Sequence, residues 1–416
     1  MIRIGGLLFL LVATAHSLFA QQQFNYENTV YLPQVKTVQC FNSQKEQSVP
    51  VINLRSKDQI LLSFDDLDGG TKNYSYTIEH CTSDWKPSGL STIDYLNSFS
   101  TDRINDYSYA SNTLQKYTHY KLKLPNEQVS PKISGNYLLK VYLDDDLNKP
   151  VLSQRFYILD NQAGVAIDQV PSQQVQLRSS NQKVNFTVSF SGTIQNPFTD
   201  LKTVVIQNRI PQTESRSSRP NAIRPGALVY NDPQQNDFPA GNEFRKFDIR
   251  SLRYKTEHVQ DILRDTVNTV ILFADQPPTG KYANLVDENG KFFIRNQDER
   301  DPATESDYAN VSFTLDASQL SGRDDVYVVG GFNNYATNES SRMRYDAARK
   351  RYVKTLKLKQ GLYDYKYFLK SNTAQVGQTT LEGSFFETEN EYLVFVYYKR
   401  PGSRWEELIG YALRSR

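Results

Sequence analysis

The sequence predicts an all-β protein built from tandem β-sandwich domains. Short runs of alternating apolar and polar residues recur along the chain, and turns rich in glycine, asparagine and aspartate separate them. The composition agrees, because 27 Tyr and 22 Phe stand against only 2 Trp and 2 Met. Aromatic residues of this kind suit a pleated, half-buried surface.

The clearest strand is expected over residues 184–190. Val184, Phe186, Val188 and Phe190 alternate there with polar neighbours, which is the pattern of a strand with one buried face. The spacing of Val259, Ile262 and Leu263 fits one short amphipathic helical turn. Further alternating runs occupy residues 74–78, 137–143, 311–315 and 392–398, and turn signals lie at residues 68–70, 134–136, 288–290 and 360–361.

Residues 1–20 have the features of a cleavable signal peptide. A positive charge at Arg3 precedes an apolar stretch, and Ala20 stands just before Gln21. Gln21 at the new N-terminus argues against a lipid anchor on cysteine, since the first cysteine is Cys40. No later run approaches the roughly 20 apolar residues of a transmembrane helix. We therefore expect an exported protein with no transmembrane segment.

The length of 416 residues, at about 100 to 200 residues per domain, predicts three domains. The first covers residues 21–160 and the second residues 161–300. Within the second, residues 211–226 read as a basic, strand-free, exposed loop. A charged linker at residues 298–307 then leads into a C-terminal domain over residues 301–416.

The charge balance argues against nucleic acid as a partner. The chain has 48 Lys and Arg and 46 Asp and Glu, and loss of Arg3 leaves 47 against 46, a net charge of +1. This balance gives no electrostatic reason to expect binding to nucleic acid. No sequence feature indicates a small-molecule substrate or a cofactor.

Candidate chemistry is sparse, and we expect no catalytic or metal site. His80, Cys81 and Asp84 lie close together, but His80 and Cys81 would point to opposite faces of an extended strand. The acidic groups at residues 65–68 and 144–146 lack the spacing of a calcium loop and read as solvated turns. No hydrolase or phosphate-binding motif is present. The sequence therefore predicts a protein that binds other macromolecules and is not an enzyme.

The two cysteines leave two alternatives open. Cys40 and Cys81 could form a disulfide in an oxidising compartment, or they could remain as two unpaired thiols in the core. Separation in sequence does not decide between them.

The C-terminal part resembles the immunoglobulin-like early-set modules, which include glycogen- and starch-binding domains. The resemblance rests on residues 331–335 (GFNNY) and 361–367 (GLYDYKY). Tyr335 stands where the first sugar-stacking tryptophan would be expected, and no second one follows. The resemblance implies the fold, and it leaves an exported carbohydrate-binding accessory protein as the alternative function.

A longer resemblance covers the first domain. Residues 63–70 (SFDDLDGG), 74–96 (YSYTIEHCTSDWKPSGLSTIDYL), 105–126 (NDYSYASNTLQKYTHYKLKLPN) and 134–142 (SGNYLLKVY) are similar to the plug protein family of the type IX secretion system of Bacteroidota. The similarity continues through residues 244–254, 286–298 and 397–411. The signature residues, with structural or interface roles, are His80, Cys81, Asp84, Trp85, Tyr95, Asn112, Tyr117, His119, Tyr120, Pro125 and Asn126.

This resemblance implies a periplasmic protein, peripheral to the outer membrane. It would bind the periplasmic mouth of the outer-membrane translocon barrel and occlude the pore when no cargo is engaged. Wide barrels enclose aqueous channels, so a secretion pore needs such a plug. Plugging requires a rigid body and a reversible interface, and no catalytic residue.

Tyrosines between residues 94 and 120 are candidates for that interface. A tyrosine offers a large contact area at low entropic cost, and its hydroxyl tolerates water. The alternative is that these side chains pack over the sandwich as a structured loop. They are Tyr95, Tyr107, Tyr109, Tyr117 and Tyr120.

Overall fold

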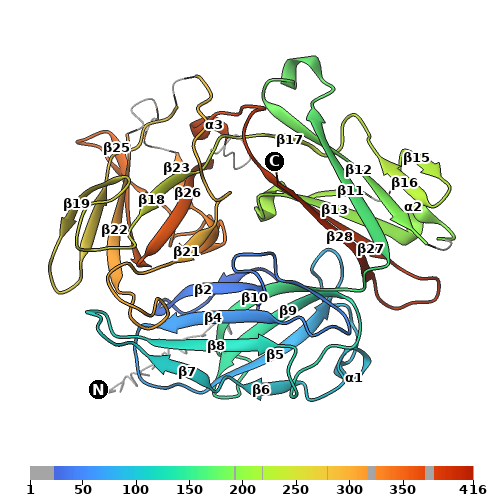
Figure 1. Ribbon diagram of the computed structural model, residues 1–416, viewed down its shortest axis with the longest axis horizontal. Helices are drawn as coiled ribbons and strands as arrows, with labels where there is room; N and C mark the ends of the chain where they lie inside the picture. The colour runs from blue at the N-terminus through green and yellow to red at the C-terminus, as the bar shows by residue number, and fades with distance from the viewer. Residues whose placement is uncertain are drawn as a thin grey trace, which may run out of the picture.

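A computed structural model describes residues 23–415, apart from residues 192–193, 218, 279, 317–319, 321, 323 and 371–378. The expected signal peptide at residues 1–20 lies outside the described residues. In the described part of the chain, six sheets pack in pairs into three sandwiches (Figure 1). The prediction of an all-β protein with tandem β-sandwiches is confirmed.

The first sandwich is formed by an unbroken stretch of chain. Its elements are β1 (Thr29–Val30), β2 (Val35–Asn42), β3 (Val51–Asn53), β4 (Ile60–Asp66), β5 (Tyr74–Cys81), α1 (Thr92–Tyr95), β6 (Thr101–Arg103), β7 (Asp106–Tyr109), β8 (Thr118–Leu124), β9 (Gly135–Leu143) and β10 (Pro150–Leu159). One sheet has the order β1-β10-β9-β5-β6, with β3 beside β10, and the other has the order β2-β4-β8-β7. Alternating residues such as Tyr74, Tyr76 and Ile78 are buried between the two sheets.

The second sandwich draws on two distant parts of the chain. Its elements are β11 (Ala163–Pro171), η1 (Val175–Leu177), β12 (Asn181–Phe190), α2 (Pro197–Asp200), β13 (Leu201–Gln207), η2 (Pro211–Thr213), β14 (Ser215–Ser217), β15 (Ala222–Arg224), β16 (Ala227–Tyr230), β17 (Asp237–Pro239), β27 (Glu391–Tyr398) and β28 (Glu407–Ser415). One sheet has the order β11-β12-β16-β15, with β17 beside β12, and the other has the order β14-β13-β27-β28.

The third sandwich lies between these two parts in sequence. Its elements are β18 (Arg245–Asp248), β19 (Val259–Leu263), β20 (Thr269–Leu272), β21 (Phe292–Ile294), β22 (Tyr308–Leu315), β23 (Asp325–Val329), η3 (Gly331–Asn333), β24 (Arg344–Asp346), β25 (Arg351–Lys359), β26 (Gly361–Lys370) and α3 (Thr379–Glu382). One sheet has the order β18-β26-β21, with β23 beside β26, and the other has the order β19-β20-β22-β25-β24.

The third sandwich is therefore an insertion in the second. β27 pairs along the whole of β13, from Leu201 opposite Tyr398 to Gln207 opposite Tyr392. In Figure 1 these red C-terminal strands lie against the green strands of the second sandwich. The expected boundary near residue 300 falls inside the third sandwich, because pairing between strands so far apart in sequence leaves no local signal.

The expected loop at residues 211–226 also differs from the prediction. It is not strand-free, since β14 pairs with β13 and β15 pairs with β16. Residues 221–226, which include β15, are exposed. Likewise, residues 259–263 form strand β19 and no helical turn, because they pair with β20.

The three sandwiches form a triangle in which each contacts the other two (Figure 1). No helix in the described part of the chain is long and apolar enough to cross a membrane.

Candidate functional site

The first joint, between the first and second sandwiches, is mainly apolar. Tyr157 of β10 stacks on Phe395 of β27 with ring centroids 4.4 Å apart. Tyr397 donates a hydrogen bond to Asn136 Oδ1 over 2.8 Å, so its buried hydroxyl is satisfied. The cluster consists of Val49, Cys81, Trp85, Leu138, Tyr157, Leu159, Val204, Leu393, Phe395, Tyr397 and Leu408.

The turn at residues 82–86 is inserted into this joint. Trp85 has a φ of 59° and is 6% exposed, and the Arg155 guanidinium lies 4.4 Å from its ring centroid. The Ser83 amide donates to Glu406 Oε2 over 2.8 Å, which ties the turn to the second sandwich. Asp84 stays partly exposed, where hydrogen bonds from Lys86 and Thr82 lower its pKa to about 2. The sequence signature around Trp85 therefore marks a joint within the molecule.

His80 and Cys81 point to opposite faces of β5, as the alternation predicts. His80 faces the core of the first sandwich, where burial lowers its pKa to about 4. Its Nε2 lies 3.4 Å from the Ser134 carbonyl oxygen, and a Cβ on Gly135 would lie 2.4 Å from the same nitrogen. Cys81 faces the first joint, and burial raises the pKa of its thiol to about 12. A neutral imidazole and a protonated thiol on opposite faces form no catalytic pair.

The disulfide considered from the sequence does not form. Cys40 and Cys81 are both free thiols. Cys40 lies on β2 and Cys81 on β5, which belong to different sheets, and Cys81 points away from the sheet that holds Cys40. The alternative of two unpaired thiols holds in the structure.

The second joint, between the first and third sandwiches, contains a buried charge cluster. The carboxylate of Asp65 accepts hydrogen bonds from His119 Nδ1 at 2.5 Å, from the Tyr308 hydroxyl at 2.6 Å and from Lys359 Nζ at 2.7 Å. Both Asp65 and Lys359 are buried. Burial by itself would raise the pKa of Asp65, but Lys359 and His119 outweigh it and hold the pKa below its usual value. Burial lowers the pKa of Lys359.

This cluster corrects the prediction for residues 65–68. Asp65 and Asp66 were expected in a solvated turn, yet both are fully buried at the end of β4. Asp66 accepts a hydrogen bond from the Tyr74 hydroxyl over 2.8 Å and pairs with Lys72. The sequence carries one weak signal of this burial, which is a carboxylate within an otherwise apolar strand. If another part of the molecule covers such a strand, the carboxylate needs a partner.

Tyr117 and its neighbours extend the second joint. Tyr117 is 2% exposed, and its hydroxyl donates to the Ser306 carbonyl oxygen over 2.9 Å. Lys359 Nζ lies 4.2 Å from the Tyr117 ring centroid, which adds a cation–π contact to the buried charge. Asp307 accepts hydrogen bonds from the Leu114 and Gln115 amides. His119 and Tyr117 thus contribute to the contact between the first and third sandwiches.

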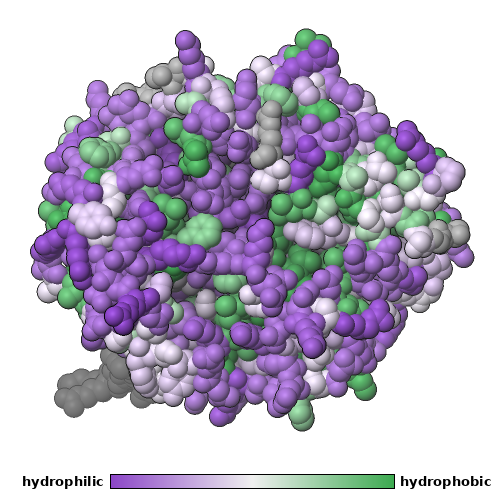
Figure 2. Space-filling model, viewed as in Figure 1, coloured by the Kyte–Doolittle hydropathy of each residue, from purple (hydrophilic) through white to green (hydrophobic). Residues whose placement is uncertain are grey.

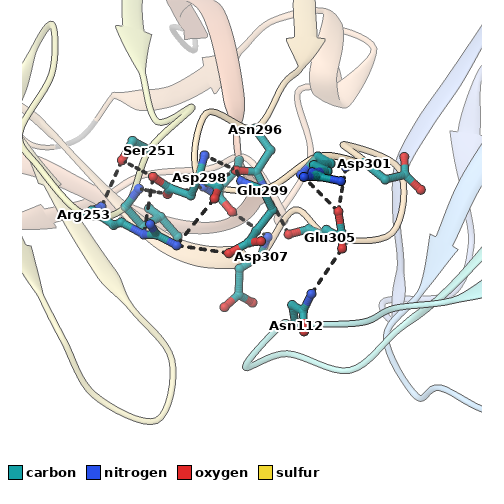
Figure 3. Close-up of polar contacts among 12 residues, drawn as sticks. Asn112, Ser251, Arg253, Asn296, Asp298, Glu299, Asp301, Glu305 and Asp307 are labelled. Carbon is teal, nitrogen blue, oxygen red and sulfur yellow. Dashed lines mark hydrogen bonds and ion pairs between the residues drawn. The ribbon is translucent and has the colours of Figure 1, made fainter.

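The charged segment at residues 298–307 is a well-connected part of this joint. Figure 3 shows Asp298 held by the Ser251 hydroxyl and by Arg253, while Glu305 accepts from Asn112 Nδ2 over 3.1 Å. Arg253 also pairs with Glu299 at 3.0 Å. The expected linker therefore fastens the third sandwich to the first.

The third joint, between the second and third sandwiches, combines an apolar cluster with an ion pair. Glu391 of β27 pairs with Lys291 at 2.5 Å and with Arg209 at 3.2 Å. Tyr335 is 4% exposed and donates to the Gly290 carbonyl oxygen over 3.2 Å. Tyr335 is therefore no exposed platform for stacking a sugar. The apolar members are Ile210, Phe244, Tyr327, Val329, Tyr335 and Phe368.

The remaining signature residues stabilise the first sandwich itself. Tyr95 donates to the Ile78 carbonyl oxygen over 3.2 Å, and Tyr120 stacks on Phe64. The Pro125 carbonyl oxygen accepts from Gln59 Nε2 over 2.7 Å. Asn126 donates to the Tyr76 hydroxyl over 2.8 Å, and its Oδ1 accepts from the Val129 amide.

The five candidate interface tyrosines divide into two groups. Tyr95, Tyr117 and Tyr120 are buried, so for them the alternative of packing over the sandwich holds. Tyr107 and Tyr109 are 42% and 58% exposed on β7, the edge strand of its sheet. Figure 2 shows a largely hydrophilic face, with hydrophobic side chains gathered mainly over the second sandwich. Among the described residues, no group of three or more His, Cys, Asp or Glu could hold a metal ion.

Comparisons with known proteins match this architecture. Residues 35–160 match a family model described as the type 9 secretion system plug protein, first domain. The chain is similar to a hypothetical protein from Parabacteroides merdae whose crystal structure is known, with 34% sequence identity and a TM-score of 0.90. The match covers 95% of this chain and 100% of the Parabacteroides merdae chain. None of the curated proteins matches the chain.

Proposed function

We propose that this chain is the periplasmic gating subunit of the type 9 secretion system, because residues 35–160 match the model of the first domain of that system's plug protein. It binds the periplasmic mouth of the outer-membrane translocon barrel and occludes the pore when no cargo is engaged. It lies peripheral to the outer membrane and acts without catalysis.

The observation that supports this proposal most is the triangle of three joined sandwiches. Each joint buries side chains from two sandwiches, and the second joint adds a fully buried ion pair. A hinge between domains would expose the apolar clusters of the first and third joints to water, which is unfavourable. The chain is therefore built as one stiff body, which an occluding part requires.

The exposed tyrosines of β7 supply a contact surface for the barrel. Tyr107 and Tyr109 pack edge to face with centroids 5.8 Å apart, so they form one aromatic patch. Aromatic residues are enriched in protein interfaces, where the hydroxyl can bond to a polar rim.

An affinity pull-down tests the partner. The tagged mature protein, mixed with detergent-solubilised native outer membranes, should retain the translocon barrel. Cells that lack the protein should admit large antibiotics, because the pore stays open. An intact permeability barrier in the deletion strain would refute the gating role.

The tyrosine patch can be tested separately. The double variant Tyr107→Ser and Tyr109→Ser should bind the barrel at least about tenfold more weakly, because aromatic anchors dominate interface energies. The control is Tyr254→Ser, since Tyr254 is 54% exposed and lies on the third sandwich. If the barrel binds both variants equally well, the contact surface lies elsewhere on the protein.

A further inference from the structure

A cavity of about 160 Å³ lies where the three sandwiches meet. Each sandwich contributes a cationic side chain to its wall, namely Arg155 from the first, Arg209 from the second and Lys291 from the third. The volume far exceeds the roughly 10–15 Å³ that a single water requires, so the cavity has room for a small organic molecule. Its walls belong to no single sandwich, so the site exists only in the assembled triangle.

The ion pairs of the wall leave positive charge in excess. Among the described residues that line the cavity, Glu214 is the only carboxylate, and it pairs with Arg216. Lys291 and Arg209 share a single carboxylate, that of Glu391, at 2.5 Å and 3.2 Å. These pairs therefore join three cations to two carboxylates, which leaves one positive charge without a counter-charge.

Arg155 adds a further positive charge, and it forms no ion pair with a carboxylate in the described part of the chain. Its Nε donates to the Tyr26 carbonyl oxygen over 2.7 Å, and its guanidinium lies 4.4 Å from the Trp85 ring centroid. Its two terminal nitrogens have no hydrogen-bond partner among the described residues. A half-buried guanidinium with free donors favours an anion beside it, because charge-assisted hydrogen bonds are strong.

The unpartnered polar atoms of the wall are mostly hydrogen-bond donors. Nε2 of Gln39, Gln47 and Gln154 is buried without a partner among the described residues, and Gln154 is only 4% exposed. The same holds for Nε of Arg209. All four nitrogens can only donate, whereas Asn289 Oδ1 is the one unpartnered acceptor of the described wall outside the ion pairs. A carboxylate accepts hydrogen bonds at both oxygens and donates none, so it complements such a set.

Apolar side chains complete the wall. Tyr157 and Phe292 line the same cavity and offer surface to a carbon skeleton. We propose that the cavity binds a small organic anion, with carboxylate or phosphate oxygens facing the three cations that the three sandwiches contribute. Such a ligand contacts all three sandwiches and stabilises their assembly. The site is separate from the tyrosine patch of β7, so this inference does not depend on the proposed function.

Calorimetry and thermal unfolding of the full mature chain test this inference. The anionic probes are succinate, citrate and glycerol 3-phosphate, and the neutral counterparts are succinamide and glycerol. At least one anion should bind with a stoichiometry of one and raise the unfolding temperature, and it should bind more weakly as the salt concentration rises. The proposal is overturned if none of the three anions binds at millimolar concentration, or if a neutral counterpart binds as tightly as the anion that it matches.

Two variants locate the site. Arg155→Gln removes one charge of the wall and should weaken binding of the effective anion at least about tenfold. Arg224→Gln removes the same charge from the exposed strand β15 and should leave binding unchanged. Gln154→Leu removes a buried donor and should also weaken binding. Circular dichroism checks that each variant folds, and Gln154→Leu decides if Arg155→Gln does not. Full binding by both variants would overturn the assignment to this cavity.

Discussion

At the residue scale, the second joint depends on a compensated charge. Asp65 and Lys359 are buried together, so neither can lose its partner without a large cost in free energy. A buried ion pair contributes little net stability, because the loss of hydration of the two charges offsets their attraction. Removal of one member tests this more sharply than removal of both.

We expect Lys359→Met to lower the free energy of unfolding by about 3–5 kcal/mol, since it removes the lysine counter-charge of the buried Asp65 carboxylate and leaves it only His119 and Tyr308 as partners. Urea unfolding followed by fluorescence measures the change. The exposed Lys123 on β8 provides the control, and Lys123→Met should stay within about 0.5 kcal/mol of the wild type. Adding Asp65→Asn to Lys359→Met should restore part of the loss, and a purely additive double variant would contradict the pairing.

A second carboxylate predicts a pH dependence. Asp364 of β26 is buried, and its Oδ2 accepts from the Glu288 and Gly290 amides. Burial and the nearby Asp287 nevertheless raise its pKa to about 7. In the unfolded chain the pKa of Asp is about 3.9. Between these values the folded state holds a proton that the unfolded state has lost, so the contribution of Asp364 to stability falls as pH rises through this window.

The variant Asp364→Asn removes this titration. From pH 5 to pH 8 the wild type should lose about 2–3 kcal/mol more stability than the variant, measured by urea unfolding at both pH values. Parallel curves for the two proteins would show that Asp364 is ionised in the folded state at pH 5.

At the element scale, alternation predicted the strands well, because it is encoded locally. The runs at residues 184–190 and 392–398 form β12 and β27. The same rule placed His80 and Cys81 on opposite faces. It could not tell that the Cys81 face meets the second sandwich, or that Asp65 is covered, since both depend on packing between strands far apart in sequence. The domain boundary near residue 300 failed for the same reason.

Fragments test the insertion of the third sandwich. Residues 161–300 contain β13 but lack β27, its partner at the centre of the sheet. We expect this fragment to be unfolded by circular dichroism, whereas residues 161–416 should give a cooperative thermal transition. A cooperative transition of the shorter fragment would contradict the paired sheet.

At the scale of the whole molecule, the three joints connect each sandwich to the other two. Trp85→Ala removes the ring that lies against Tyr157 and under Arg155 in the first joint. It should cost about 3–5 kcal/mol and increase the radius of gyration measured by small-angle X-ray scattering. Phe198→Ala, at a side chain that is 45% exposed, should change neither quantity. An unchanged radius of gyration in a destabilised Trp85→Ala protein would show that the other two joints are enough to hold the three sandwiches in place.

The return of β27 and β28 to the second sandwich also sets the order in which the sandwiches can form as the chain emerges. The first sandwich has all its strands once residue 159 has emerged into the compartment where the chain folds, so it can form before the rest. The second must wait with β13 unpaired until the last strands emerge, after the third sandwich is complete. The triangle therefore closes only after β27 and β28 have emerged, so a chain that stops before residue 391 cannot assume this shape.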